Sequence, residues 1–380
     1  MKNREWLLTN GLGSYSIGAA DESKCQREHA LFTDVLRPPL RRETCIRRLH
    51  GTVFVDELWR PLVTTGKGDS GRHFSSCFKL ANGLPVYEYS SARLVLQKRL
   101  FMEPGVHALY VQYRVLQAEE KCRLRIQPLL MLPDSFFESD FTDSPLQIGE
   151  NAFAFTFELR DGRKLYFTAD VDVKIVIVNN WQATHFSETG QTAPEVNFTP
   201  AALSLVLTKG QPATVRIGLD EVNSFQPEKI LQKLPLIGKT PQRKIFDFSS
   251  EQRGQLLYKA DDFVIERATI NSLQNTTILA GYPDSADNGR SMLLALPGLL
   301  IAAGDFERAE KVMEMLKSSA YLNQLPLDFS EQPVPPTYTG ADVALWYFIA
   351  AHEYWQASHN RDFLERTYSF LLQLLMELID

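Results

Sequence analysis

The sequence has little cysteine, no excess of basic residues and no long apolar run, and each lack excludes a class of protein. Its cysteines, Cys25, Cys45, Cys77 and Cys122, form no CxxC pair and have no nearby cysteine–histidine pairing. We therefore expect reduced thiols, with neither a disulfide framework nor a zinc site. The net charge of −6 gives no electrostatic basis for binding nucleic acid.

A membrane-spanning or secreted protein is also excluded by this pattern. The longest apolar run, residues 292–303, is interrupted by Pro297 and is much shorter than the roughly 20 residues that span a bilayer. The opening residues, MKNREWLLTNG, lack the apolar core of a signal peptide. We expect a cytoplasmic protein. Dinucleotide and nucleotide sites are excluded as well, because NGLGSYSIG lacks the third glycine of a Rossmann motif and no Walker A sequence occurs.

Alternating apolar residues fill the first part of the chain and predict β-structure. In residues 153–159 every second side chain is phenylalanine or leucine, and Asp161-Gly162 follows as a tight-turn signal. Residues 93–116 and 202–219 repeat the arrangement of two alternating runs around a turn. So many strands at hairpin spacing predict a large antiparallel β-sandwich over residues 1–225.

From residue 226 the apolar period becomes that of helices. Residues 226–248 contain three prolines and are typical of a linker with a short helix, and residues 249–380 form a helical domain. Ser249 precedes Gln252 at capping-box spacing, and the apolar stripe that follows continues to Val264.

Two later helices have clear N-cap residues, Asp305 and Asn360. Between them, residues 341–356 are apolar almost all round, which predicts a helix buried among others. The last helix keeps its apolar stripe up to Asp380, which is typical of an interrupted domain. Alternatively, this stripe covers the sandwich or a partner chain.

Three segments resemble a known family. They are EWLLTNGLGSYSIGAA (5–20), AGYPDSADNGRSMLLALPGLLIAAGDFERA (280–309) and YTGADVALWYFIAAHEYW (338–355). They are similar, in order, to the opening, the barrel signature and the YNTVDATLWFFEA segment of bacterial and archaeal glycogen debranching enzymes. The resemblance implies a β-sandwich followed by an (α/α)6 barrel, of which this chain would supply about six of twelve helices.

The resemblance also implies an activity. Family members hydrolyse α-1,6-linked glucose at branch points of glycogen or limit dextrin, with inversion and without cofactor or metal. Inverting hydrolysis requires one protonated carboxyl as general acid and one carboxylate that activates water. By position, Asp342 matches the general acid, and the second carboxylate belongs to the half-barrel that this chain lacks.

The surroundings of Asp342 allow two interpretations. It is the only charged residue between Thr337 and Ala351, so burial among apolar side chains would raise its pKa and keep it protonated. Alternatively, it complements the positive N-terminus of its helix, which would lower its pKa.

The resemblance places substrate-binding residues at Tyr282, Asp287, Arg290 and Tyr338. Asp287 and Arg290 match the Asp and Arg of the family's DWGRD turn, where they would hydrogen-bond glucose hydroxyls. The alternative is a mutual ion pair between Asp287 and Arg290 in a solvated helix cap, worth about 0–1 kcal/mol.

The same turn departs from the family pattern. Asp284-Ser285 replaces a Trp-Phe pair, Asn288 replaces a second Trp, and Ser291 replaces an Asp. Three aromatic stacking surfaces for sugar are therefore absent. Two functions remain open: a debranching-type hydrolase completed by a companion polypeptide or by a longer parent protein, or a non-catalytic glucan-binding or regulatory relative. A third interpretation is an assembly module whose half-barrel self-associates.

Overall fold

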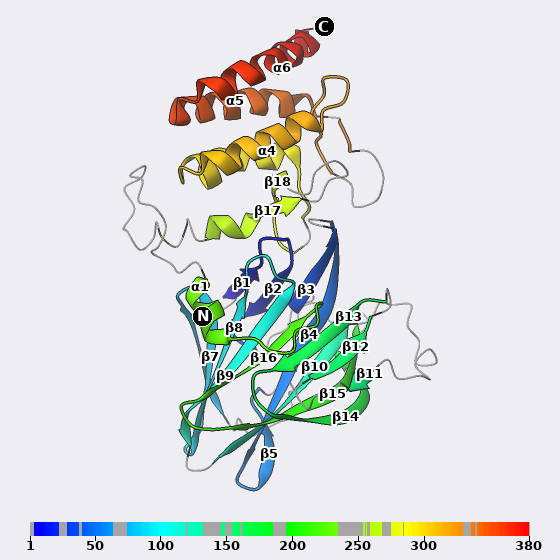
Figure 1. Ribbon diagram of the computed structural model, residues 1–380, viewed down its shortest axis with the longest axis vertical. Helices are drawn as coiled ribbons and strands as arrows, with labels where there is room; N and C mark the ends of the chain where they lie inside the picture. The colour runs from blue at the N-terminus through cyan, green and yellow to red at the C-terminus, as the bar shows by residue number, and fades with distance from the viewer. Residues whose placement is uncertain are drawn as a thin grey trace. The chain divides into compact units, whose positions relative to one another are not determined.

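A computed structural model of the chain divides into two compact units, each with its own apolar core (Figure 1). The first comprises residues 1–10, 14–34 and 43–234, and the second comprises residues 11–13, 35–42 and 235–380. The structure describes residues 4–22, 29–37, 40–63, 74–118, 121–131, 146–148, 154–159, 162–184, 195–234, 254, 256, 259–267, 275–283, 285–329, 336–338 and 340–379.

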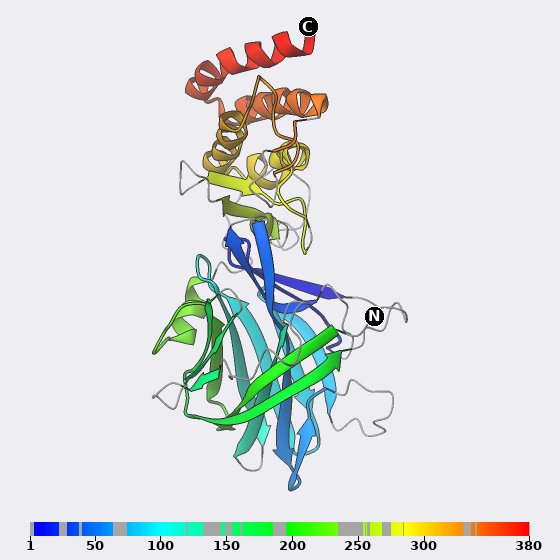
Figure 2. The ribbon, with the colours of Figure 1, turned by 90° about the vertical axis from the view of Figure 1, so that its right-hand side faces the viewer.

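The first unit contains two antiparallel sheets of eight strands each, seen as two layers in Figures 1 and 2. The first sheet has the order β1 (Glu5–Thr9), β2 (Tyr15–Ala19), β3 (Ala30–Arg37), β4 (Leu40–Val55), β10 (Cys122–Met131), β15 (Glu195–Leu207), β14 (Val173–Thr184), with β5 (Leu58–Pro61) paired to β4. The second has the order β11 (Leu146–Ile148), β12 (Ala154–Glu158), β13 (Lys164–Ala169), β16 (Pro212–Gly218), β9 (Ala108–Ala118), β8 (Leu94–Met102), β7 (Leu84–Ser90), β6 (Ser75–Ala81).

Alternation along the strands places one face of each sheet in a shared core. Strand β8 alternates buried and half-buried residues over most of its length, and its buried Leu96 and Leu100 join the same cluster as Ile126 of β10. Phe155 and Phe167 stack across β12 and β13 with ring centroids 4.2 Å apart. The prediction of antiparallel β-structure in this part of the chain is confirmed.

The first unit extends past the expected boundary at residue 225. Helix α1 (Pro227–Lys233) lies in the segment that the sequence suggests is a linker, but Ile230 and Leu234 belong to the core of the sheets. Residues 235–248, the rest of that linker, lie outside the described residues, as do Ser249 and Gln252 of the expected capping box.

The second unit combines a two-stranded sheet with helices. Its elements are the 3-10 helix η2 (Asp261–Phe263), β17 (Val264–Arg267), β18 (Asn275–Ile278), α3 (Gly289–Leu296), the π-helix η3 (Pro297–Ile301), α4 (Phe306–Ser318), α5 (Ala341–Ser358) and α6 (Arg361–Ile379). The expected helical stripe through Val264 is wrong at its end. Val264 pairs with Ile278 in the sheet, because strand pairing overrides the local helical period.

The two N-cap residues predicted from the sequence, Asp305 and Asn360, both cap helices in the structure. The side chain of Asp305 accepts a hydrogen bond from the Arg308 amide at 3.1 Å, and that of Asn360 accepts one from the Phe363 amide at 3.1 Å. The expected burial of α5 on all sides is wrong, since Leu345 and Ile349 are about half exposed. Over the residues it describes, the structure has no helix both long and apolar enough to cross a bilayer.

A close backbone approach fixes the start of α3. The amide of Gly289 donates to the carbonyl of Leu327 at 2.8 Å, and a Cβ at Gly289 would lie 2.1 Å from the carbonyl oxygen of Pro326. Leu327 in turn donates to the carbonyl of Thr337 at 2.7 Å, shortly before α5 begins. Only glycine fits at position 289 without moving one of these backbone segments.

We expect Gly289→Ala to lower the free energy of unfolding by about 1–3 kcal/mol, because the methyl group would overlap a backbone atom that cannot rotate away. Denaturant unfolding of the chain measures this loss. Gly298→Ala is the matched control: Gly298 also lies in a helical segment and has no heavy atom within 4 Å of an added Cβ. Equal stability of the two variants would show that the approach at Gly289 is not a constraint.

Candidate functional site

Four of the predicted site residues lie at the entrance of α3 or contact it: Tyr282, Asp287, Arg290 and Asp342. A short loop connects this entrance to β18. Leu279 and Asp287 form an isolated β-bridge, and the amide of Ala280 donates to the carbonyl of Ala286 at 3.2 Å. These bonds close the loop on itself and return the chain to the end of β18. Asp284, within this loop, lies outside the described residues.

Asp287 is an interior residue rather than a surface ligand. It is 1% exposed, forms an ion pair with Arg267 of β17, and accepts a hydrogen bond from the Thr277 hydroxyl at 3.0 Å. Burial raises the pKa of its carboxyl, while Arg267 and Thr277 act in the opposite direction. The expected ion pair between Asp287 and Arg290 is therefore wrong, since each has a different partner.

Asn288 is the N-cap of α3. Its side-chain oxygen accepts a hydrogen bond from the Ser291 amide at 3.0 Å, and its side-chain nitrogen donates to Asp328 at 2.5 Å. Asn288 and Asp328 also form a β-bridge, and a second bridge joins Asp328 to Thr337. The residue that replaces a family tryptophan thus links α3 to the segment preceding α5.

The structure brings Arg290 and Asp342 together from different helices. Arg290 lies in the first turn of α3 and Asp342 in the first turn of α5. The guanidinium donates twice to the carboxylate, from Nε to Oδ2 at 2.5 Å and from Nη2 to Oδ1 at 2.8 Å. This two-bond geometry is the one in which arginine recognises carboxylates best. Both side chains are about two-fifths exposed.

The expectation that burial raises the pKa of Asp342 is wrong in this structure. The carboxyl is accessible to solvent, and its hydrogen bonds with Arg290 hold its pKa below the ordinary value. Its charged form is favoured, which suits the acceptance of hydrogen bonds from hydroxyl groups. A proton donor requires a different environment.

The two predicted tyrosines contact other parts of the unit. The ring of Tyr282 lies 5.9 Å from that of Phe263, and the hydroxyl of Tyr338 donates to the carbonyl of Ser319 at 3.0 Å. Tyr338 also packs against Tyr321, with ring centroids 6.0 Å apart. Burial raises the pKa of the Tyr338 hydroxyl, which therefore stays a neutral hydrogen-bonding group.

The sequence analysis did not predict three residues that make contacts in this region. Arg267 forms an ion pair with Asp287, and Asp328 accepts a hydrogen bond from the Asn288 side chain. Arg42 donates hydrogen bonds to the carbonyls of Pro283 and Ser285, the latter at 2.8 Å. By its contacts Arg42 belongs to the second unit. Nothing in the local pattern marks these three, because each acts on a residue 20 or more positions away.

Within the described ranges, no group of three or more histidine, cysteine, aspartate or glutamate side chains is arranged to hold a metal ion. We call Arg290 and Asp342, at the starts of α3 and α5, the corner. It presents a paired carboxylate and guanidinium, accessible to solvent, beside two helix N-termini. Such groups bind hydroxyl groups and assist proton transfer.

Two family models match the sequence. The one described as "Glycogen debranching enzyme N terminal" matches residues 4–214, and the one described as "Amylo-alpha-1,6-glucosidase" matches residues 258–380. No curated protein matches the chain.

Solved structures resemble the chain distantly. A bacterial glucoamylase complexed with acarbose is 12% identical with a TM-score of 0.48, over 98% of this chain and 57% of that one. A family GH92 α-mannosidase from Bacteroides thetaiotaomicron is 10% identical with a TM-score of 0.29, over 96% and 58%. A heparan sulfate lyase from Pedobacter heparinus is 16% identical with a TM-score of 0.25, over 39% and 22%. The chain spans little more than half the length of the glucoamylase and the mannosidase.

We expect Arg290→Gln to raise the pKa of Asp342 toward the ordinary aspartate value of about 3.9, because the variant removes the main group that stabilises the carboxylate. In the wild type, the pair is intact above that value and is lost as pH falls through the lowered pKa. Carbon-detected NMR titration of the aspartate carboxyls measures the shift. Arg361→Gln, which removes an exposed arginine paired with Glu365, should leave Asp342 unchanged; an unchanged pKa in Arg290→Gln would contradict the assignment.

We expect Arg267→Met to lower the free energy of unfolding by about 3–5 kcal/mol, since it leaves the Asp287 carboxylate buried without its counter-charge. The double variant Arg267→Met with Asp287→Asn removes both charges and should regain most of this loss. Denaturant unfolding of both variants provides the comparison. If the double variant is less stable than the single one, the ion pair is not what stabilises Asp287.

Proposed function

The chain belongs to the glycogen debranching enzyme family, and we propose that it supplies the general acid, Asp342, of an inverting α-1,6-glucosidase acting on branch points of glycogen or limit dextrin. One observation carries the proposal. Asp342 and Arg290 come from the two motifs that resemble the family most closely, 52 residues apart, and they form a two-bond pair accessible to solvent.

The Arg290–Asp342 pair describes the protein before substrate binds, not the state in which a proton is transferred. With Arg290 bound to it, the Asp342 carboxyl is ionised and cannot protonate a leaving oxygen. A glucan whose hydroxyl groups accept hydrogen bonds from Arg290 would draw the guanidinium away. Exclusion of water around Asp342 would then raise its pKa into the range of a general acid.

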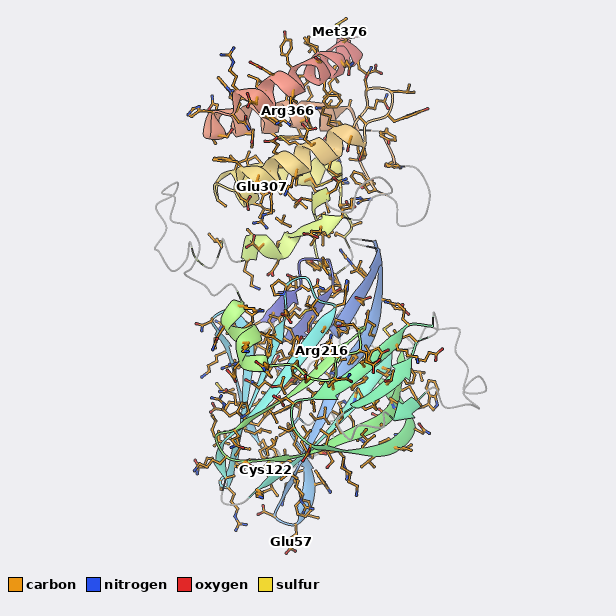
Figure 3. The ribbon with its side chains drawn as sticks, viewed as in Figure 1. Glu57, Cys122, Arg216, Glu307, Arg366 and Met376 are labelled. Atoms are coloured by element: carbon orange, nitrogen blue, oxygen red, sulfur yellow. The ribbon has the colours of Figure 1, made fainter. Side chains whose placement is uncertain are left out.

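The exposed apolar surface of α5 and α6 supports the proposal that another polypeptide segment packs against these two helices. Leu345 and Ile349 of α5 are exposed, as are several large side chains of α6, among them Met376 (Figure 3). The exposed apolar side chains of α6 are Tyr368, Leu372, Leu375, Met376, Leu378 and Ile379. Apolar faces of this extent are typical of interaction surfaces. We propose that a companion polypeptide, or a further part of a longer parent protein, covers them, completes the helical barrel and provides the carboxylate that activates water.

A non-catalytic glucan-binding function is the second candidate. It is favoured by Asn288, which serves as a helix cap where the family places a tryptophan, so that the corner has lost a stacking surface. A carboxylate held ionised by arginine also suits hydroxyl binding better than acid catalysis. In this case the corner would hold a terminal glucose without cleaving it.

We expect Asp342→Asn to lower glucose release from a branch-limit dextrin by about 10²–10⁴-fold in the presence of the completing polypeptide, because the amide cannot donate the proton. Release of free glucose under single-turnover conditions measures the step. Glu353→Gln is the matched control, since Glu353 is an exposed carboxylate on the same helix. It should retain full activity.

The two candidate functions, hydrolysis and non-catalytic glucan binding, predict different effects of Asp342→Asn on glucose release and glycogen binding. If the completed wild type releases no more glucose than Asp342→Asn, hydrolysis is the wrong function. Retained glycogen binding by both proteins, measured by co-sedimentation, would then support the non-catalytic candidate. Loss of glycogen binding in both would contradict either role. A defined dimer of the chain alone in light scattering would instead identify a second copy as the companion.

A further inference from the structure

Next to the corner lies Asp328, a residue to which neither the family motifs nor the proposed hydrolysis assigns a role. It belongs to the stretch between the two family-like segments 280–309 and 338–355. Its backbone forms one β-bridge with Asn288 and another with Thr337, whose amide donates to the Asp328 carbonyl at 3.0 Å. The place of Asp328 beside the first turn of α3 is therefore fixed by the backbone on two sides.

The side chain of Asp328 is held at one oxygen and open at the other. Oδ1 accepts the hydrogen bond from the Asn288 side chain at 2.5 Å, which keeps the carboxylate at the N-cap of α3. Among the residues that the structure describes, none donates a hydrogen bond to Oδ2, and Asp328 is exposed to solvent. Oδ2 is therefore an acceptor that a ligand can reach.

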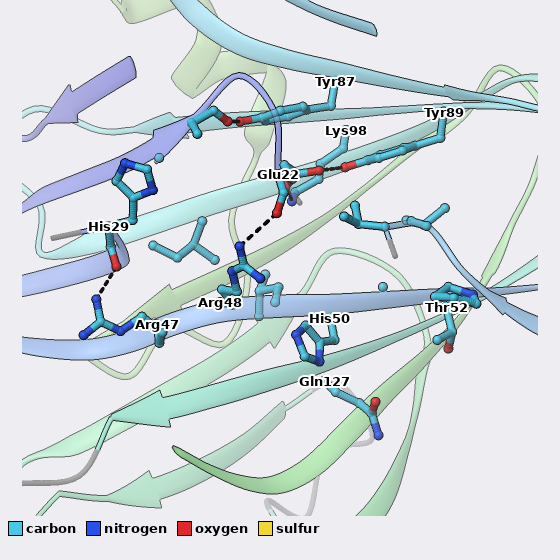
Figure 4. A pocket seen from close by; sticks show the side chains of 18 of the residues that line it. Glu22, His29, Arg47, Arg48, His50, Thr52, Tyr87, Tyr89, Lys98 and Gln127 are labelled. Carbon is cyan, nitrogen blue, oxygen red and sulfur yellow. Dashed lines mark hydrogen bonds and ion pairs between the residues drawn. The ribbon is translucent and has the colours of Figure 1, made fainter. Parts of the chain in front are cut away.

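Two other carboxylates of the chain show what distinguishes Asp328. Glu22, beside the cavity of the first unit, uses both of its oxygens: Oε1 lies 2.5 Å from the Lys98 ammonium, and Oε2 accepts a hydrogen bond from the Tyr89 hydroxyl (Figure 4). The side chain of Glu307 in α4 is 80% exposed and pairs with a half-exposed lysine four positions along the helix. Glu22 is fixed but fully occupied, and Glu307 is accessible but held only by a flexible side chain. Asp328 is both fixed and accessible.

Asp328 is also close enough to the corner to act on Arg290. The hydrogen bonds and the charge of Asp342 raise the pKa of the Arg290 guanidinium, and the charge of Asp328 adds to this effect. In the same guanidinium, Nε and Nη2 donate to Asp342, whereas Nη1 donates to no group among the described residues. One guanidinium nitrogen and one carboxylate oxygen, both on solvent-accessible side chains, are thus left for a ligand.

A donor and an acceptor of this kind suit the hydroxyl groups of a sugar, because each hydroxyl can both donate and accept a hydrogen bond. Two carboxylates beside one guanidinium leave negative charge in excess, which disfavours an anionic ligand. Asn288 provides no aromatic face on which a sugar ring could stack, so polar contacts have a larger share in recognition here.

We propose that Asp328 is a further substrate-binding residue, whose Oδ2 accepts a hydrogen bond from a hydroxyl group of the terminal glucose while Arg290 contacts a second hydroxyl. The inference rests on the proposed function, which names a glucan as the ligand of the corner. Asp328 would bind and orient the sugar, and the proton would still come from Asp342.

Co-sedimentation of the full 380-residue chain with glycogen tests this role. We expect Asp328→Asn to raise the apparent Kd for glycogen by about ten-fold or more, because a hydrogen bond to a charged acceptor is lost. The side-chain oxygen of the new asparagine can still accept the hydrogen bond from Asn288, so the contacts that fix this segment are kept. Thermal unfolding of Asp328→Asn should therefore match that of the wild type.

Glu307→Gln is the matched control, because it makes the same change from carboxylate to amide on an exposed residue of the same unit. It should bind glycogen as the wild type does. If Asp328→Asn does not fold, carbon-detected NMR of the wild type decides: isomaltose, an α-1,6-linked glucose disaccharide, should shift the carboxyl signal of Asp328 and not that of Glu307. The absence of such a shift overturns the proposal.

The outcomes separate this inference from the proposed hydrolysis. Equal glycogen binding by the wild type and Asp328→Asn, or equal weakening by both variants, overturns the role of Asp328 and leaves hydrolysis at Asp342 standing. Weaker binding by Asp328→Asn alone, in a protein whose completed wild type releases no glucose, supports Asp328 and overturns hydrolysis. No glycogen binding by the wild type contradicts both.

Discussion

The arrangement of the candidate site depends on the close approach between Gly289 and the backbone carbonyl of Pro326. That approach holds the start of α3 against residues 326–328, which are in turn bonded to Thr337 shortly before α5. The first turns of two helices thereby come together, and Arg290 reaches Asp342. The site is thus built from backbone bonds that no side chain could replace, and a glycine is required for steric reasons.

Two aspartates of the family motifs have opposite environments. Asp287 is buried, and its interactions with Arg267 and Thr277 stabilise the loop before α3. Asp342 is accessible, and its only described ion pair is with an arginine that solvent also reaches. Of the two carboxylates, therefore, only that of Asp342 is accessible to a ligand from solvent. Asp287 contributes to the fold, by fixing the turn that precedes Arg290.

The sandwich balances charge in most of its interior. Asp34, 1% exposed, lies 2.6 Å from Arg163 and 2.7 Å from His107, and the buried guanidinium of Arg216 lies 2.5 Å from Asp220. These pairs follow the usual requirement that a buried charge has a counter-charge.

Much of the architecture follows from sequence alone. Alternation predicted the antiparallel sheets, and Asp305 and Asn360 marked two helix starts, because period and capping depend on residues within one turn or one strand. Family motifs predicted Asp342 and Arg290 as site residues, but not that the two side chains contact each other. The pairing of β17 with β18, the partner of each charged group and the direction of the Asp342 pKa were decided only by tertiary structure. Each depends on groups brought together from distant parts of the chain, whose burial and separation no local pattern encodes.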